Sequence, residues 1–108
     1  MKKIAVLGCG LWGRNIVRNF YNLNALGMVC DLDEENLAKV REQYPDVKTT
    51  KDFNDIINSD EITAVCVVTP SHTHYKFVKA MLEAGKHVMS EVTAGVTMDE
   101  LYWLTETV

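Results

Sequence analysis

The sequence predicts an α/β fold, a doubly wound parallel sheet, on three observations. Apolar segments alternate with helical patterns along the chain, and a Gly-x-Gly-x-x-Gly turn follows the first apolar segment. Residues 64–68 form a continuous apolar run, which is typical of a central parallel strand buried on both faces. Alternating strands and helices form a parallel sheet with right-handed crossovers and helices on both faces. We therefore expect a Rossmann sheet with the strand order 3-2-1-4-5.

Two apolar strands and an amphipathic helix open the chain. The strands are expected at residues 3–7 and 25–31, where apolar residues predominate. A helix over 11–22 separates them. Its apolar residues lie near one face, which should pack on the sheet: Leu11, Ile16, Phe20 and Leu23.

The middle of the chain adds a helix, a short strand and a second helix. Asp33 is the expected N-cap of a helix over 34–44, and Pro45 stops that helix. A short strand is expected near 47–49. The helix over 52–58 should face the core through its apolar residues: Phe53, Ile56 and Ile57.

The last third of the chain repeats the alternation after the central strand. A helix is expected over 73–84, with Gly85 as its C-terminal stop, and a strand follows at 87–91. Thr97 and Glu100 fit a capping box at the start of a further helix.

The glycine turn is the clearest functional motif. At a helix N-terminus, free backbone N–H groups and the positive end of the helix dipole bind a pyrophosphate. In this role Gly8 permits the tight turn, Gly10 lets the phosphates approach the backbone, and Gly13 lets the helix pack close to the strand. Leu11 and Trp12 lie within the same turn and are expected to contact the cofactor with the glycines.

Asp31 follows the apolar residues of the second predicted strand. Its distance in sequence from Gly8 is close to the spacing of ~20 residues expected for a ribose-binding carboxylate. Such a carboxylate accepts hydrogen bonds from the adenosine ribose and repels a 2′-phosphate, which predicts NAD in preference to NADP. In the alternative interpretation, the glycines form an ordinary turn and Asp31 caps the next helix.

Composition excludes several other classes of function. The chain has 108 residues, 47% hydrophobic and 24% charged, as in ordinary soluble domains. A net charge of −4 gives no electrostatic basis for binding nucleic acid or a membrane. Three cysteines without Cys-x-x-Cys spacing indicate reduced thiols in a cytoplasmic protein, without a metal site. His72 and His74 are two apart and would not share a helix face, which argues against a metal pair.

Two further segments follow the fourth and fifth predicted strands and should lie near the glycine turn. They are Thr69-Pro70-Ser71-x-x-His74 and the run from Ala84 to Glu91. With the glycine turn and Asp31, these motifs resemble, in order and spacing, the family of glucose–fructose oxidoreductase and inositol dehydrogenase (Gfo/Idh/MocA). The resemblance covers essentially the whole chain, but only the cofactor domain of that family.

The resemblance implies roles for four more residues. Thr69 and Pro70 would line the ribose and nicotinamide side of the cofactor, His74 would lie beside that loop, and Glu91 would reach the nicotinamide ribose. In the alternative interpretation, Thr69 is a turn or cap residue and His74 is a first-turn helix residue.

One departure from the family bears on catalysis. The family commonly has Glu-Lys-Pro where this chain has Glu91-Val92-Thr93. Val92 cannot transfer a proton, and Lys86 lies at the opposite end of the last predicted strand. The catalytic residue is therefore unknown, while cofactor binding through Glu91 is retained.

The resemblance also implies the kind of parent protein. We expect residues 1–108 to be the N-terminal dinucleotide-binding domain of a two-domain homo-oligomer, inactive on its own. The expected activity is NAD-dependent hydride transfer on a small-molecule substrate: a sugar, cyclitol or related polyol. Two alternatives stay open. One is an NAD-recycling lyase or glycosidase-like enzyme, and the other is a non-catalytic NAD-binding or regulatory protein.

Overall fold

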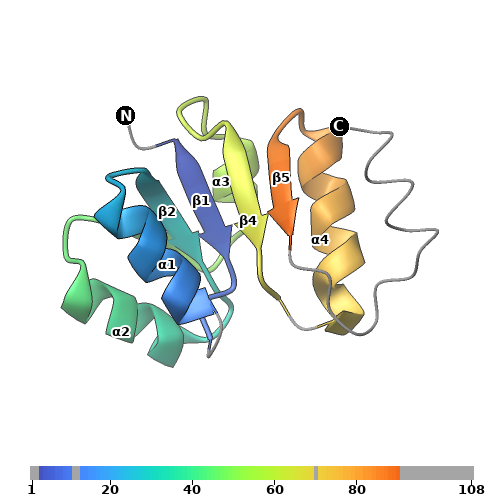
Figure 1. Ribbon diagram of the computed structural model, residues 1–108. Coiled ribbons are helices and arrows are strands. Elements are labelled where there is room, and N and C mark those ends of the chain that lie inside the picture. The colour runs from blue at the N-terminus through green and yellow to red at the C-terminus, as the bar shows by residue number, and fades with distance from the viewer. Residues whose placement is uncertain (1–2, 11–12, 70, 91–108) are drawn as a thin grey trace.

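The computed structural model describes residues 3–10, 13–69 and 71–90, which form a parallel sheet with helices on both faces (Figure 1). Strands and helices alternate along these residues, as predicted. In chain order they are β1 (Ile4–Leu7), α1 (Gly13–Asn22), β2 (Leu26–Cys30), α2 (Glu34–Gln43), β3 (Lys48–Thr50), α3 (Asn54–Ile57), β4 (Ala64–Val67), α4 (Ser71–Glu83) and β5 (His87–Ser90).

The five strands are parallel, and their order β3-β2-β1-β4-β5 confirms the prediction. Their last residues are register partners and form one row across the sheet: Thr50, Cys30, Leu7, Val67 and Ser90. The arrowheads in Figure 1 consequently point toward one edge. The residues that follow these strands start from that same edge.

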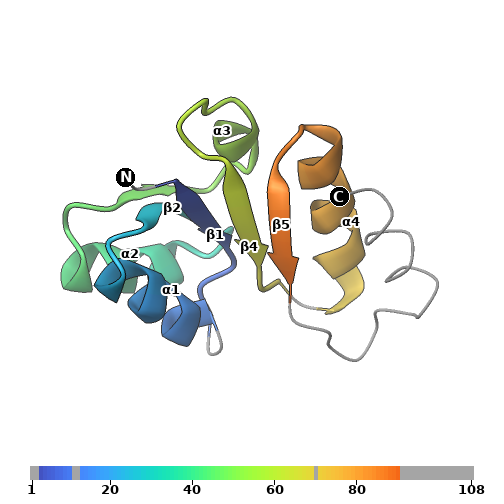
Figure 2. The same cartoon turned by 45° about the horizontal axis from the view of Figure 1, so that its top comes forward.

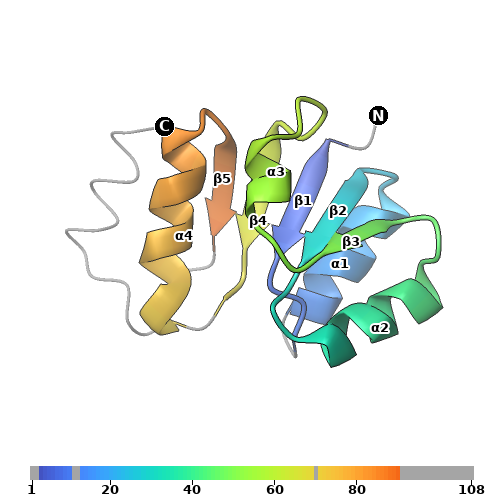
Figure 3. The ribbon, with the colours of Figure 1, turned by 180° about the vertical axis from the view of Figure 1, so that it is seen from behind.

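The core lies on both faces of the sheet. On one face, α1 and α2 bury Val17, Leu37 and Val40 against the sheet. On the other face, the buried residues of α3 and α4 are Ile56, Val78 and Met81. Figure 2 shows α1 and α2 together beside β1 and β2, and Figure 3 shows the opposite face.

The central strand β4 contributes to both of these clusters. Val65 and Val67 pack on the α3 and α4 face, and Cys66 packs on the α1 and α2 face. Adjacent side chains of a strand point to opposite faces, so a strand covered on both sides must be apolar throughout. The prediction that 64–68 is buried on both faces is thus confirmed, although the strand itself ends at Val67.

The end of α1 differs from the sequence expectation. Leu23 was expected on the buried face but is 72% exposed, and Val17 is buried instead. The helix ends at Asn22, and Asn24 adopts a positive φ of 57°. The N–H groups of Asn24 and Ala25 then close the helix on the carbonyls of its last turn. Leu23 therefore lies in a turn, beyond the helical periodicity that placed it on the core face.

Helix α4 begins two residues earlier than predicted, at Ser71, so the backbone of His74 lies within its first turn. Gly85 ends the helix as expected, with a positive φ of 82°. Its N–H donates to the Leu82 carbonyl, and the next N–H donates to the Met81 carbonyl, which is a Schellman arrangement.

The third helix is shorter than the expected 52–58, because Asp52 forms a turn before it and accepts a hydrogen bond from the Asn54 N–H. Ile56 is fully buried, as predicted. The expected capping box at Thr97 and Glu100 lies outside the described residues. None of the helices in the described part of the chain has the length and apolar character needed to cross a membrane.

Candidate functional site

Two glycines of the turn after β1 are required by the fold itself. Gly8 has a φ of +100°, and a Cβ there would lie 2.7 Å from the Val68 carbonyl oxygen at the end of β4. A Cβ on Gly13 would lie 2.2 Å from the Gly8 carbonyl oxygen. Both distances are shorter than real side chains tolerate. Gly8 therefore permits the turn, and Gly13 permits the close approach of α1 to it, as the sequence predicted.

Gly10 differs from these two glycines. Its φ lies outside the left-handed region, and among the described residues a Cβ would meet only the Asn36 side-chain nitrogen, at 4.0 Å. That is an ordinary contact distance, so the described part of the fold does not require glycine here. The Gly10 carbonyl accepts the Arg14 N–H, which places Gly10 beside the first turn of α1. Because Gly10 has no side chain, the described residues leave its backbone uncovered near a helix N-terminus, which fits a phosphate-bearing ligand.

Asp31 follows β2 directly, and its carboxylate is surrounded by donors. Oδ2 accepts the Cys9 backbone N–H at 2.8 Å, the Cys9 thiol at 3.4 Å and the Asn36 Nδ2 at 3.2 Å. Oδ1 accepts the Asp33 N–H at 2.8 Å. The Asp31 N–H in turn donates to the carbonyl of Thr50 at the end of β3. The carboxylate is thus fixed between the glycine turn and the start of α2.

The alternative interpretation of Asp31 as the helix cap is not what the structure contains. Asp33 is the N-cap of α2, and its carboxylate accepts the Glu35 N–H at 2.9 Å. The prediction for Asp33 is therefore confirmed. Asp31 instead lies before the helix and remains half-buried, which leaves part of its carboxylate accessible.

The two buried thiols nearest to Asp31 in sequence or by contact, Cys9 and Cys30, are neutral. Burial and, next, the negative charge of Asp31 beside it together raise the pKa of Cys9 to about 12. Burial likewise raises the pKa of Cys30 to about 12, again with Asp31 as the leading charge. Both thiols are consequently protonated at neutral pH, so Cys9 can act as a hydrogen-bond donor. Cys9, Cys30 and Cys66 are all free of disulfides.

Thr69 supplies a second polar group at the same edge. It follows β4, and its backbone nitrogen lies 3.2 Å from the position of a Cβ on Gly8. Its hydroxyl oxygen is buried and has no hydrogen-bond partner among the described residues. Buried hydroxyls are normally paired, so this unpartnered hydroxyl fits a ligand bound where the glycine turn and the end of β4 meet. Together with the lack of a side chain at Gly10, this hydroxyl is compatible with a dinucleotide at this edge of the sheet.

Several predicted site residues cannot be placed. Leu11, Trp12, Pro70 and Glu91 lie outside the described residues, as does Val92 of the departure from the family motif. The structure places the backbone of His74 in α4 and does not describe its side chain.

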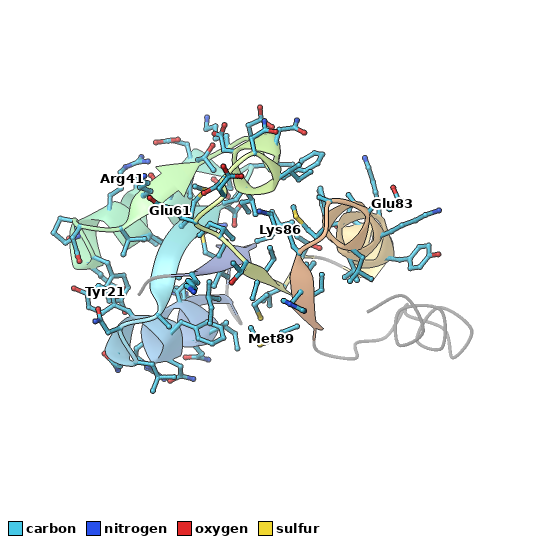
Figure 4. The ribbon with its side chains drawn as sticks, turned by 90° about the horizontal axis from the view of Figure 1, so that it is seen from above. Tyr21, Arg41, Glu61, Glu83, Lys86 and Met89 are labelled. Atoms are coloured by element: carbon cyan, nitrogen blue, oxygen red, sulfur yellow. The ribbon has the colours of Figure 1, made fainter. Side chains whose placement is uncertain are left out.

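Lys86 is removed from this site, as the sequence indicated. Its ammonium donates to the Ser59 carbonyl at 2.7 Å and to the Ile62 carbonyl at 2.6 Å. Figure 4 views the molecule from this side and shows Lys86 at the turn between α4 and β5. Lys86 therefore binds the segment before β4 to the start of β5. This is the edge of the sheet where the strands begin, opposite the glycine turn.

Sequence reasoning did not identify two members of the site, Cys9 and Asn36. Cys9 was considered only as a thiol. Its backbone N–H, within the glycine turn, donates to Asp31 directly after β2. Asn36 is the third residue of α2, a position whose side chain often turns back over the helix start. That position was the available signal for it.

The chain matches, over residues 2–101, the model of a family described as "Oxidoreductase family, NAD-binding Rossmann fold" (GFO_IDH_MocA). It belongs to this family. The resemblance inferred from the motifs is thereby confirmed, as is the prediction of NAD as the cofactor of this domain. The substrate and reaction of a whole protein do not follow from a match to its cofactor domain.

Three curated relatives illustrate the range of the family. An inositol 2-dehydrogenase of Rhodococcus erythropolis is 36% identical over 82% of this chain and 27% of its own. The scyllo-inositol 2-dehydrogenase (NADP(+)) IolW of Bacillus subtilis is 29% identical over 91% of this chain and 27% of its own. A glycosyl hydrolase family 109 protein of Shewanella amazonensis is 25% identical over 97% of this chain and 26% of its own. The chain thus spans about a quarter of these relatives.

Solved structures agree on the fold. An NAD-binding protein from Listeria innocua matches with a TM-score of 0.86 at 22% identity, over 99% of this chain and 32% of that chain.

Proposed function

We propose that this chain is the dinucleotide-binding domain of an NAD-dependent oxidoreductase that acts on a sugar, cyclitol or related polyol. The observation that carries the proposal is the Asp31 carboxylate, fixed by four donors beside a glycine turn. When bound, NAD supplies a nicotinamide carbon that exchanges hydride with a carbinol carbon of the substrate. The inositol dehydrogenases among the relatives support this class of substrate.

Each described group has a distinct part in holding the cofactor. The open backbone at Gly10 receives the pyrophosphate at the start of α1, and Asp31 accepts hydrogen bonds from the adenosine ribose. The buried Thr69 hydroxyl, which has no partner among the described residues, donates a hydrogen bond to the cofactor. By resemblance, Pro70, His74 and Glu91 complete the nicotinamide side.

The preference for NAD over NADP is part of the proposal, and one relative named for NADP(+) makes its test worthwhile. A 2′-phosphate would bring negative charge against the carboxylate of Asp31, which already accepts four donors. We expect calorimetry to give tighter binding of NAD than of NADP, and Asp31→Ala to reduce or reverse this difference. Equal affinity of the unmodified chain for both dinucleotides would refute this role of Asp31.

The proton-transfer group of the reaction is assigned outside this chain. Val92 stands where the family commonly has a lysine, and the other nearby lysine in sequence, Lys86, tethers the opposite edge. We therefore expect the 108-residue chain to bind NAD but not to reduce it with a panel of polyols. Appreciable NADH formation by the chain alone would show that it contains its own acid or base.

An NAD-recycling glycosidase or lyase is the second candidate. Val92 favours it, as does the relative assigned to glycosyl hydrolase family 109. In such a reaction a substrate carbinol is oxidised, a neighbouring group is eliminated, and the hydride returns, so no net NADH forms. A parent protein that releases one NADH per product supports the oxidoreductase, whereas product without NADH supports the second candidate. NAD binding without either product would instead indicate a regulatory protein.

A further inference from the structure

The side chain of Asn36 lies between the two parts of the candidate cofactor site. Its Nδ2 donates to Asp31 Oδ2 at 3.2 Å and is the group nearest to a Cβ built on Gly10 among the described residues, at 4.0 Å. Asn36 is half-buried and belongs to the first turn of α2, so its backbone is fixed by the helix. The amide therefore faces both the ribose carboxylate and the open backbone of the glycine turn.

The start of α2 is a modified capping box. In the usual form, the side chain of the third helical residue accepts the N–H of the N-cap. Here Asp31 Oδ1 accepts that N–H from Asp33, and Asn36, at the third position, donates to Asp31 Oδ2. The Asp31 carboxylate thus accepts the N–H that the side chain of the third helical residue usually accepts. Asn36, which is that third residue, instead donates a hydrogen bond to the carboxylate. The helix start and the cofactor carboxylate share one hydrogen-bond network.

The lone pairs of Asp31 show what this network leaves available. A carboxylate has about four acceptor sites, two on each oxygen. Among the described residues, Oδ2 accepts the Cys9 N–H, the Cys9 thiol and the Asn36 amide, whereas Oδ1 accepts the Asp33 N–H alone. Within the part of the chain that the structure describes, Oδ1 therefore keeps a free acceptor site, and the Asn36 amide helps to hold Oδ2 turned toward the glycine turn.

We propose that Asn36 is a positioning residue for the adenosine ribose, holding Asp31 so that Oδ1 presents its free acceptor site to the 2′-hydroxyl. This inference rests on the proposed role of Asp31. Asn36 is a neutral donor, so it fixes the carboxylate without supplying the positive charge that would attract a 2′-phosphate. The ligand class that it selects is an adenosine dinucleotide with an unmodified 2′-hydroxyl.

The test compares NAD with an analogue whose adenosine ribose lacks the 2′-hydroxyl, using calorimetry on the chain and its variants. Asn36→Ala should weaken NAD binding about five- to tenfold, the effect of losing one hydrogen bond to a charged group. Asn36→Ala should change the affinity for the deoxy analogue less than about twofold. The analogue has no 2′-hydroxyl to donate to Asp31, so the orientation of that carboxylate matters less. The matched control is Asn19→Ala, which makes the same change at an exposed position of α1 and should leave both affinities unaltered.

A second variant keeps the test independent of folding. Asn36→Asp is nearly isosteric and places an acid in the first turn of a helix, where it is tolerated. It replaces the donor by an acceptor that repels Asp31, so it should weaken NAD more than Asn36→Ala does. Wild-type NAD affinity in both variants would overturn the proposal, as would equal losses for NAD and the deoxy analogue. If Asp31→Ala binds NAD with unchanged affinity, the proposed role of Asp31 in binding the ribose is itself wrong.

Discussion

Gly10 and Gly13 belong to the same motif, but the structure predicts opposite consequences for changing each of them to alanine. A Cβ at Gly13 would lie 2.2 Å from the Gly8 carbonyl oxygen, well inside the distance that real contacts reach. The backbone of the turn must then shift by about 1 Å, an overpacking that costs roughly 1–3 kcal/mol. The better helix propensity of alanine offsets at most about 1 kcal/mol of this.

Gly10→Ala should leave the fold intact. Among the described residues its Cβ would meet only the Asn36 amide, at an ordinary 4.0 Å, and its φ lies outside the left-handed region. Lower entropy of the unfolded chain then adds about 0.4–1 kcal/mol of stability. The new methyl group occupies the backbone that the pyrophosphate approaches. NAD binding should therefore weaken at least about tenfold, or about 1.4 kcal/mol.

The assay measures thermal unfolding without ligand and NAD binding by calorimetry for both variants. Gly13→Ala should lower the Tm by about 4–8 °C for each kcal/mol lost, whereas Gly10→Ala should keep or raise it. Gly85→Ala is the control, because it introduces strain at a φ of +82° far from the site. It should lower the Tm without changing NAD affinity. A stable Gly13→Ala, or a Gly10→Ala variant that binds NAD normally, would refute the reasoning.

Three further predictions concern stability. Lys86→Met removes two charge-assisted hydrogen bonds to carbonyls and should cost about 2–3 kcal/mol in urea unfolding, with unchanged NAD affinity. Asp33→Ala removes the N-cap of α2 and should cost about 1 kcal/mol; no loss would contradict the cap. Burial, then Asp31, raises the pKa of Cys9 and of Cys30 from 9.0 to about 12. The thiols of the unfolded chain, with a pKa of 9.0, therefore lose their protons at a lower pH than those of the folded protein. The free energy of unfolding is unaffected below pH 9 and decreases as the pH rises from 9 toward 12. The decline is up to about 1.4 kcal/mol per pH unit and thiol. Cys30→Ala should flatten it, and an equal slope in that variant would exclude the thiol as its source.

The strand order and the glycine turn could be predicted because they depend on local signals. An uninterrupted apolar run distinguishes a central strand, and the glycines and Asp31 occur at characteristic distances from strand ends. The register row that ends at Leu7 and Cys30 then brings these segments to one edge. The parallel topology thus brings the glycine turn and Asp31, which are far apart in sequence, close together in space.

Helix ends and contacts between distant segments could not be predicted in the same way. Leu23 fits the helical periodicity, but the left-handed conformation of Asn24 ends the helix before it. The bonds of Cys9 and Asn36 to Asp31 join three segments and depend on their relative positions, which no periodicity encodes. Sequence reasoning therefore identified the carboxylate but not the groups that orient it.

The same network explains why the cofactor domain alone does not identify the reaction. Asp31 is fixed by bonds to the glycine turn, to the end of β3 and to the start of α2, so the proposed ribose site needs little ordering when a dinucleotide binds. A site assembled in this way serves any chemistry that begins with hydride transfer. Relatives named as inositol dehydrogenases and as glycosyl hydrolases both align with it. We expect the difference between those reactions to arise where the substrate meets the nicotinamide, and the resemblance noted in the sequence implies that Val92 and Thr93 depart from the family's usual motif there.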